Sequence, residues 1–388
     1  MRKIRSRKLK KQKYMVIIGS FLFLSIFSVG YAAFSTTISL NAKGNVHPSP
    51  TYTIDQLKAT ALTEGTTDGL YVDSAEQGRY VYKGGNPNNY LTLNNETWRI
   101  LSIESDNTLK IIREDSIGNI PFDLGEESNI AGITTDGSNV GTRYSTTSTD
   151  FCYYPNYNDG CKVWGSKDTM RNSSGVLLKN PSTGVAKMKR VLTNSTTYNL
   201  PEDEAYLNIY LNGGMYAGVA VAGWYQTWSS TLSNTITSYI DDDHLWNVGL
   251  VSETSGQLTT TDIAQEKALT WQGRVGLMTA SEYVRASTNS ECTGVYAYKN
   301  TSACYDNTIS HNYLRPKSSW GQWTLSPDSN SHPNYVWYAS QQRFINFLTN
   351  SNYGAVEGRG IRPVLYLSSN VVLKGDGTTG SKFQIKTS

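Results

Sequence analysis

Residues 320–330 read W-G-Q-W-T-L-S-P-D-S-N and residues 358–367 read G-R-G-I-R-P-V-L-Y-L, and these two segments carry the strongest fold signal in the chain. Within the second, residues 361–367 form a short apolar run bounded by turn residues, which predicts a buried strand. Proline is tolerated at the first residue of a strand, so Arg362 and Pro363 are expected to mark its beginning. Aromatic side chains bury large areas, and we expect this block to close one compact domain.

Further β signals lie upstream, around Trp98. Runs rich in Tyr, Val, Ile and Leu alternate with Gly, Asn, Asp and Pro clusters, as in strands joined by turns. We expect a four-stranded meander over residues 79–82, 90–93, 97–104 and 108–114, later strands at 246–249 and 271–278, and a last hairpin of 370–373 with 382–385.

Helix signals are short and local. Thr53 with Gln56, and Thr279 with Glu282, have the spacing of capping boxes, in which each side chain bonds to the other residue's backbone. A third helix is expected over residues 202–211, because acids lie at its start and Gly213 follows its end. The expected fold is therefore α+β and β-rich, with short helices and long loops.

Composition favours an exported, strand-rich protein. Charged residues make up 17% of the 388 residues and aromatic residues 11%, with 26 tyrosines. The net charge is +3, but the first 14 residues hold eight Lys or Arg and no acid; without those eight charges the remainder has −5. A mildly acidic body argues against nucleic acid as a partner.

The N-terminus has the pattern of an export signal. A basic run is followed by residues 16–34, which are apolar and uncharged, with small residues near the end. We expect cleavage after Ala32. The alternative is an uncleaved anchor, since about 19 apolar residues can span a bilayer. Either way the body lies outside the cell, secreted or on the surface, with the membrane contacted only through this segment and with the export machinery and signal peptidase as partners.

The four cysteines form two local pairs, neither with metal-site spacing. In an exported chain we expect two local disulfides, with four free thiols as the alternative. The pairs are Cys152 with Cys161, and Cys292 with Cys304.

Catalytic and metal motifs are missing from the sequence. None of the four histidines is paired at ligand spacing, and no G-x-S-x-G occurs, so we expect no metal, no cofactor and no enzyme activity. The run of three aspartates before His244 lacks the alternating spacing of a calcium loop and is expected to be a solvated turn. If the chain were nevertheless a divergent enzyme, the candidate residues would be Asp241, Asp243, His244, Asp328 and His332.

Residues 30–46, G-Y-A-A-F-S-T-T-I-S-L-N-A-K-G-N-V, resemble the signal and first strand of exported TasA/camelysin-type proteins of Gram-positive bacteria. Those proteins are processed by a dedicated signal peptidase. The resemblance implies export and assembly at a surface or in a matrix. We therefore expect a signal peptide or anchor at 1–32, a strand and linker at 33–51, and one large domain at 52–388.

The body is similar to an uncharacterised surface-protein family of Gram-positive gut bacteria. The similarity rests on G-R-Y-V-Y-K-G-G-N-P-N-N-Y from Gly78, R-V-G-L-M-T-A-S-E-Y from Arg274, W-T-L-S-P-D from Trp323 and G-I-R-P-V-L-Y-L from Gly360. Its C-terminal part also resembles the formylglycine-generating-enzyme and C-type-lectin-like superfamily. That resemblance implies a C-type-lectin-like twisted antiparallel sheet core whose loops form a ligand surface.

Departures from that superfamily limit what the resemblance implies. No cysteine follows Cys304, the iron-binding histidines of the sulfoxide synthases have no counterpart, and the Trp-Asn-Asp calcium motif of sugar-binding lectins is missing. The fold is therefore expected without the oxidase chemistry and without the calcium-dependent sugar site.

The leading functional hypothesis is a non-catalytic, adhesin-like extracellular protein that binds a glycan or protein ligand through aromatic-rich loops. The alternatives are a structural subunit of a biofilm matrix or surface fibre, and a divergent enzyme of the formylglycine-generating-enzyme-like superfamily. The expected binding residues are Tyr153, Tyr154, Tyr157, Tyr296 and Tyr298.

Overall fold

The computed structural model divides the chain into two compact units, Met1–Pro48 and Ser49–Ser388, and all described residues lie in the second. Predictions for the leader, including cleavage after Ala32, therefore lie outside the described residues. The structure describes residues 49–123, 164–165, 170–172, 174, 176, 204–216, 219–251, 260–289, 311–317, 320–328, 335–340 and 358–387, and the backbone of strands at 142–144, 188–191, 197–200 and 345–347.

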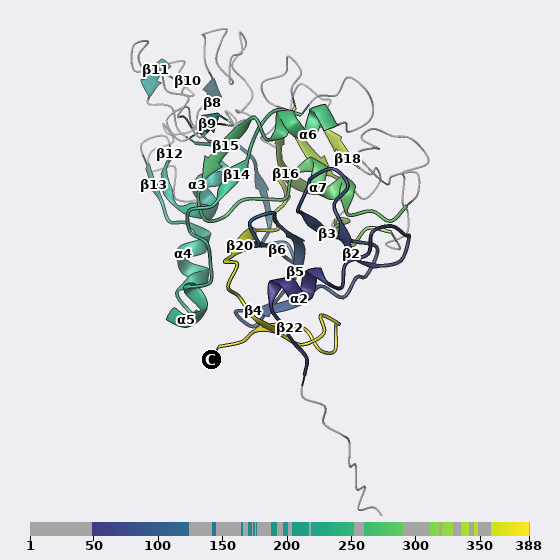
Figure 1. Cartoon of the computed structure of the whole chain (residues 1–388). Helices are drawn as coiled ribbons and strands as arrows, with labels where there is room; N and C mark the ends of the chain where they lie inside the picture. The colour runs from purple at the N-terminus through teal and green to yellow at the C-terminus, as the bar shows by residue number, and fades with distance from the viewer. Residues whose placement is uncertain are drawn as a thin grey trace, which may run out of the picture. The chain divides into compact units, whose positions relative to one another are not determined.

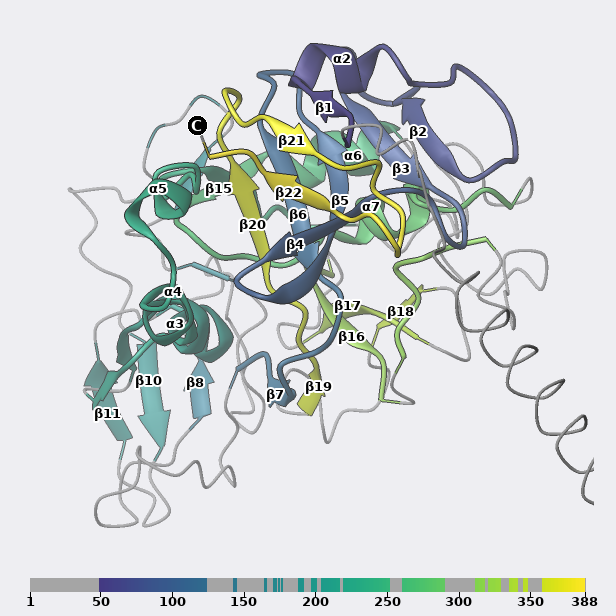
Figure 2. The ribbon, with the colours of Figure 1, turned by 90° about the horizontal axis from the view of Figure 1, so that it is seen from below.

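A curled sheet of nine strands lies at the centre of this described part (Figures 1 and 2). Its strands are hydrogen-bonded in the order β1, β21, β22, β4, β5, β3 and β2, while β6 joins β5 to β20. All of these pairs are antiparallel except β22 with β4. The strands are β1 (Thr51–Tyr52), β2 (Gly69–Val72), β3 (Tyr80–Lys83), β4 (Tyr90–Leu93), β5 (Glu96–Ile103), β6 (Leu109–Arg113), β20 (Val364–Leu367), β21 (Leu373–Lys374) and β22 (Phe383–Ile385).

Strand β5 is paired along both edges, with β3 and β4 on one side and β6 on the other. The four strands expected here are confirmed, but the expected meander is wrong, because β3 pairs with β5 and not with β4. The cause lies at Gly84, directly after β3. Its N–H donates to the Ala286 carbonyl at 2.9 Å, and its carbonyl accepts from the Tyr313 N–H at 2.7 Å. The backbone is thus held away from the sheet before β4 begins.

Strand β20 confirms the prediction for the C-terminal apolar run. It begins directly after Pro363, and all four of its residues are buried. One edge pairs with β6, and the other makes single bridges to Ile240 and Gly276. Arg362 is also buried, and its Nε donates to the Arg113 carbonyl at 2.7 Å. The pair Arg362-Pro363 therefore directly precedes an inner strand.

A second sheet packs the tryptophans of the C-terminal block. Trp323 and Trp337 on its neighbouring strands β16 and β17 are buried, whereas Trp320 is 59% exposed. Three smaller sheets accompany it within the described residues, in the orders β14-β15-β9, β12-β13 and β11-β10-β8. The second sheet has the order β18-β17-β16-β19-β7, with β7 (Asn119–Pro121), β16 (Gln322–Pro327), β17 (Val336–Ala339), β18 (Ile345–Phe347) and β19 (Gly358–Gly360).

The remaining strands and the helices are short. Both expected capping boxes are present, with Thr53 and Gln56 at α2 and with Thr279 and Glu282 at α7. The helices are α2 (Ile54–Lys58), α3 (Tyr206–Asn212), α4 (Trp224–Ser229), α5 (Asn234–Thr237), α6 (Thr260–Glu266) and α7 (Ala280–Arg285); the strands are β8 (Thr142–Tyr144), β9 (Met170–Asn172), β10 (Met188–Val191), β11 (Thr197–Leu200), β12 (Gly214–Tyr216), β13 (Val219–Val221), β14 (Leu245–Asn247) and β15 (Leu269–Gln272).

Several elements differ from the predicted bounds. The strand expected at 246–249 is β14, Leu245–Asn247, and the first strand of the last hairpin, expected at 370–373, is β21, Leu373–Lys374. Two differences are larger. The strand expected over 271–278 ends at Gln272, because Gly273 lies directly against the Trp271 ring and the chain then turns toward β20. The helix expected over 202–211 begins only at Tyr206, whose N–H donates to Asp123 Oδ1 at 3.0 Å. Its end is as predicted, since Gly213 has a φ of 81°, which glycine adopts readily.

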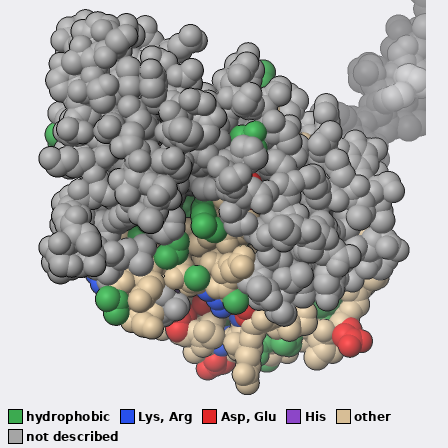
Figure 3. Space-filling view, turned by 90° about the horizontal axis from the view of Figure 1, so that it is seen from above, with side chains coloured by type: hydrophobic (Ala, Val, Ile, Leu, Met, Phe, Trp, Pro, Cys, Tyr) green, Lys and Arg blue, Asp and Glu red, His purple; other side chains and the backbone are tan. Residues whose placement is uncertain are grey.

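One large hydrophobic cluster joins the two main sheets to α2, α4 and α7. Since the described part consists of several sheets and a few short helices, the predicted β-rich α+β class is confirmed. One face carries acidic, basic and hydrophobic side chains close together, so the described part of that face has no single sign of charge (Figure 3). Within the described ranges, no helix combines the length and the apolar character needed to cross a membrane.

Candidate functional site

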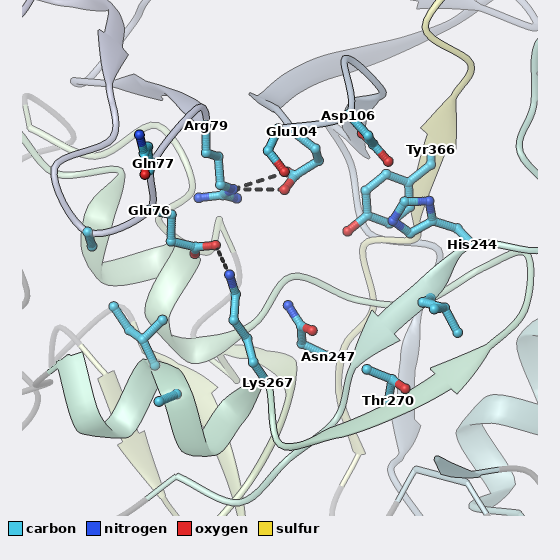
Figure 4. A pocket seen from close by; sticks show the side chains of 15 residues that line it. Glu76, Gln77, Arg79, Glu104, Asp106, His244, Asn247, Lys267, Thr270 and Tyr366 are labelled. Carbon is cyan, nitrogen blue, oxygen red and sulfur yellow. Dashed lines mark hydrogen bonds and ion pairs between the residues drawn. The ribbon is translucent and has the colours of Figure 1, made fainter. Parts of the chain in front are cut away.

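A pocket of about 850 Å³ lies beside the central sheet, and we call it the β14–α6 pocket (Figure 4). It is bordered by the segment before β3, the turn between β5 and β6, strands β14, β15 and β20, and helix α6. Its charged and polar lining residues are Glu76, Gln77, Arg79, Glu104, Ser105, Asp106, His244, Asn247, Lys267, Thr270 and Tyr366.

His244 forms one side of the pocket together with Tyr366. The two rings are stacked, with centroids 3.4 Å apart and planes 19° apart. His244 Nδ1 lies 3.0 Å from Asp241 Oδ2, which holds the ring in this orientation. Burial lowers the pKa of His244, although Asp241 acts against that shift. The imidazole is therefore neutral at pH 7, and it adds a flat aromatic surface rather than a charge.

Three polar side chains of the pocket lack a hydrogen-bond partner among the described residues. Thr270 Oγ1 is buried without one, and the Asn247 amide and the Tyr366 hydroxyl face the pocket between Lys267 and His244 (Figure 4). Burial raises the pKa of Tyr366, so its hydroxyl stays protonated and can donate. Because buried polar groups are normally paired, this part of the pocket fits a ligand that has several hydrogen-bonding groups.

Two ion pairs form the opposite side. Lys267 on the segment after α6 bonds to Glu76, and Arg79 Nε lies 3.0 Å from Glu104 Oε2 (Figure 4). Burial opposes the charge of Glu76, but Arg285, Arg79 and Lys267 together lower its pKa to about 2. The pKa of Glu104 is also lowered, because Arg79 and Lys110 outweigh the effect of burial. Both carboxylates are therefore ionised at neutral pH.

Behind this side, buried charges continue the network into the core. Arg79 contacts Asp73 and Glu282, each at 2.9 Å, and Lys110 contacts the same Glu282 oxygen at 2.7 Å. Arg285 on α7 reaches Asp73 at 2.6 Å. Buried charges persist only when paired, so the network ties α7, β3 and β6 to the side of the pocket.

The structure brings together only part of the residues named from the sequence. Asp241 and His244 are paired, and the predicted turn is confirmed by Asp243, whose N–H donates to Asp241 Oδ1 at 3.2 Å. Asp328 is buried after β16, where its N–H donates to the Tyr335 carbonyl, and it does not line the pocket. Among the described residues, no cluster of His, Cys, Asp or Glu could hold a metal ion.

The other named residues lie outside the described part of the chain. They are His332, the cysteines Cys152, Cys161, Cys292 and Cys304, and the loop tyrosines Tyr153, Tyr154, Tyr157, Tyr296 and Tyr298.

Sequence reasoning missed most of the pocket. One signal was present: Arg79, Arg99 and Lys110 are charged residues at the start of or inside apolar strands, a pattern that indicates buried ion pairs. No local signal marked Asn247, Thr270 or Tyr366. Comparison of the chain with protein-family models, curated proteins and solved structures gives no match.

Proposed function

We propose that the Ser49–Ser388 unit is a non-catalytic extracellular binding domain that recognises a glycan in the β14–α6 pocket. The observation that carries the proposal is the combination of stacked rings with unpartnered polar groups. Flat rings contact the apolar face of a sugar, and a few convergent polar groups set orientation and specificity. His244, stacked on Tyr366, supplies the ring, and the Asn247 amide and the Tyr366 hydroxyl supply the polar groups.

Three further parts of the proposal rest on the sequence. The basic and apolar leader supports export from a Gram-positive cell, with the body secreted or held at the surface. The curled sheet with short helices and long connections supports a C-type-lectin-like fold. The loop tyrosines, foremost Tyr153 and Tyr296, are the ligand-binding residues expected from the sequence.

The test is a glycan array followed by calorimetric titration of the best ligand. Asn247→Ala removes an amide that faces the pocket, and we expect affinity to fall about fivefold to thirtyfold. Asn234→Ala, at an exposed position of α5, is the matched control and should leave affinity unchanged. An array without signal, or equal affinity of the two variants, would contradict a glycan site here. Binding of a protein instead of a glycan would support a protein ligand, the other class expected from the sequence.

A second candidate function is hydrolysis in the same pocket, favoured by the Asp241–His244 pair. A neutral histidine oriented by a carboxylate can act as a general base toward water. In that case the native protein would convert the ligand, and His244→Asn would abolish this turnover. A ligand recovered unchanged after long incubation with the purified protein would eliminate this alternative.

A further inference from the structure

The charges around the β14–α6 pocket are paired except at one turn. Four cations lie within salt-bridge distance of four carboxylates, so an anionic ligand would have to break an existing pair. Asp106, on the turn between β5 and β6, lines the pocket but has no ion-pair partner among the described residues. The four cations are Arg79, Lys110, Lys267 and Arg285, and the four carboxylates are those of Asp73, Glu76, Glu104 and Glu282.

Asp106 is fixed by its own turn. Its Oδ1 accepts the Thr108 N–H at 2.9 Å and the Thr108 hydroxyl at 2.7 Å. No bond within the described residues occupies Oδ2, so this oxygen is left for a ligand. Figure 4 shows Asp106 beside the stacked rings of Tyr366 and His244.

The rings next to Asp106 also favour a positive charge. The face of an aromatic ring attracts cations. Lys110 Nζ already lies 5.2 Å from the centre of the Tyr366 ring, so the ring left for a ligand cation is that of His244, whose imidazole is neutral at pH 7. Asp241 Oδ2 lies 3.0 Å from His244 Nδ1 and adds a second negative charge nearby. A cation bound at the rim would be attracted to Asp106 with little desolvation, because Asp106 is exposed.

We infer that the glycan bears a protonated amino group, as in a hexosamine without its N-acetyl group, and that Asp106 Oδ2 accepts a hydrogen bond from this ammonium. This inference rests on the proposed function and names the class of its ligand. The sugar ring then lies on His244, while its hydroxyl groups reach the Asn247 amide.

The experiment titrates the purified protein at pH 6 and low salt with oligomers of glucosamine and, separately, with the same oligomers N-acetylated. We expect the free amine to bind more tightly by roughly 1.5- to fivefold, the range of an exposed charge pair. Asp106→Asn should remove this preference, and added salt should reduce it in the native chain. Asp243→Asn is the matched control, because Asp243 is exposed and does not line the pocket.

Each outcome is informative. Equal binding of both oligomers, unchanged in Asp106→Asn, would overturn the amino-sugar inference and leave the glycan site standing. Binding of neither would overturn both proposals. Since Asp106 is exposed on a turn, Asp106→Asn should fold normally, and its urea unfolding midpoint confirms this.

Discussion

Arg79 contacts three carboxylates at once, those of Asp73, Glu104 and Glu282, and its side chain is 4% exposed. Removing Arg79 would leave these three carboxylates charged inside the protein, away from water and without this cationic partner. Arg79→Met should therefore lower the free energy of unfolding by about 3–5 kcal/mol. Urea unfolding followed by tryptophan fluorescence measures this, since the chain has nine tryptophans.

The matched control is Arg274→Met. Arg274 lies 3.4 Å from Asp242, and both side chains are nearly half exposed. An exposed pair contributes at most about 1 kcal/mol, so this variant should change little. Similar losses in the two variants would show that the buried network does not stabilise the fold as described.

His244 gives the fold a dependence on pH. Its pKa is lowered from an ordinary 6.5 in the unfolded chain, mainly by burial. As pH falls below 6.5 the unfolded chain binds a proton that the folded chain does not, so stability falls. The effect ends once pH passes the lower, folded-state pKa, and it is absent well above 6.5. Glu76, with a pKa of about 2, loses its contribution at lower pH, from about 4.5 downward.

Urea unfolding at a series of pH values between 7 and 5 tests this. His244→Asn should lose less stability over that range than the native chain. Glu266, whose pKa is raised by burial, contributes the opposite slope, but equally in both proteins. Identical slopes for His244→Asn and the native chain would exclude this role for His244.

At the scale of elements, strand β14 is held against β20 by close packing. A Cβ on Gly276 would lie 2.4 Å from the Trp246 ring, and the Gly276 N–H donates to the Val364 carbonyl at 3.2 Å. Gly276→Ala should therefore cost about 1–3 kcal/mol of stability through overpacking and weaken glycan binding by displacing β14. Gly380→Ala, where a Cβ would meet nothing within 4 Å, should be neutral in both assays. A neutral Gly276→Ala would contradict this packing.

Local chemistry made some elements predictable. Both capping boxes, the strand after Pro363 and the stop at Gly213 depend on residues within a few positions of one another. The pairing of β3 was mispredicted because it depends on distant contacts of Gly84 with Ala286 and Tyr313. Likewise, the parallel pairing of β22 with β4 joins the two ends of the domain, and no spacing in the sequence encodes it.

At the scale of the whole molecule, the pocket draws on segments spread over some three quarters of the chain. Glu76, Glu104, His244, Lys267 and Tyr366 meet only because the central sheet brings their elements together. Sequence reasoning named His244 and Asp241 only as candidates for a divergent enzyme. It could not have paired Lys267 with Glu76, because exposed lysines and glutamates are common on any surface.

The central claim is that the β14–α6 pocket holds a sugar, and a crystal structure with a bound amino-sugar oligomer tests it most directly. The account predicts a sugar ring against His244, with hydroxyl groups within hydrogen-bond distance of the Asn247 amide. A sugar bound elsewhere, for example on the loops that carry Tyr153 or Tyr296, with this pocket left to solvent, would contradict the claim.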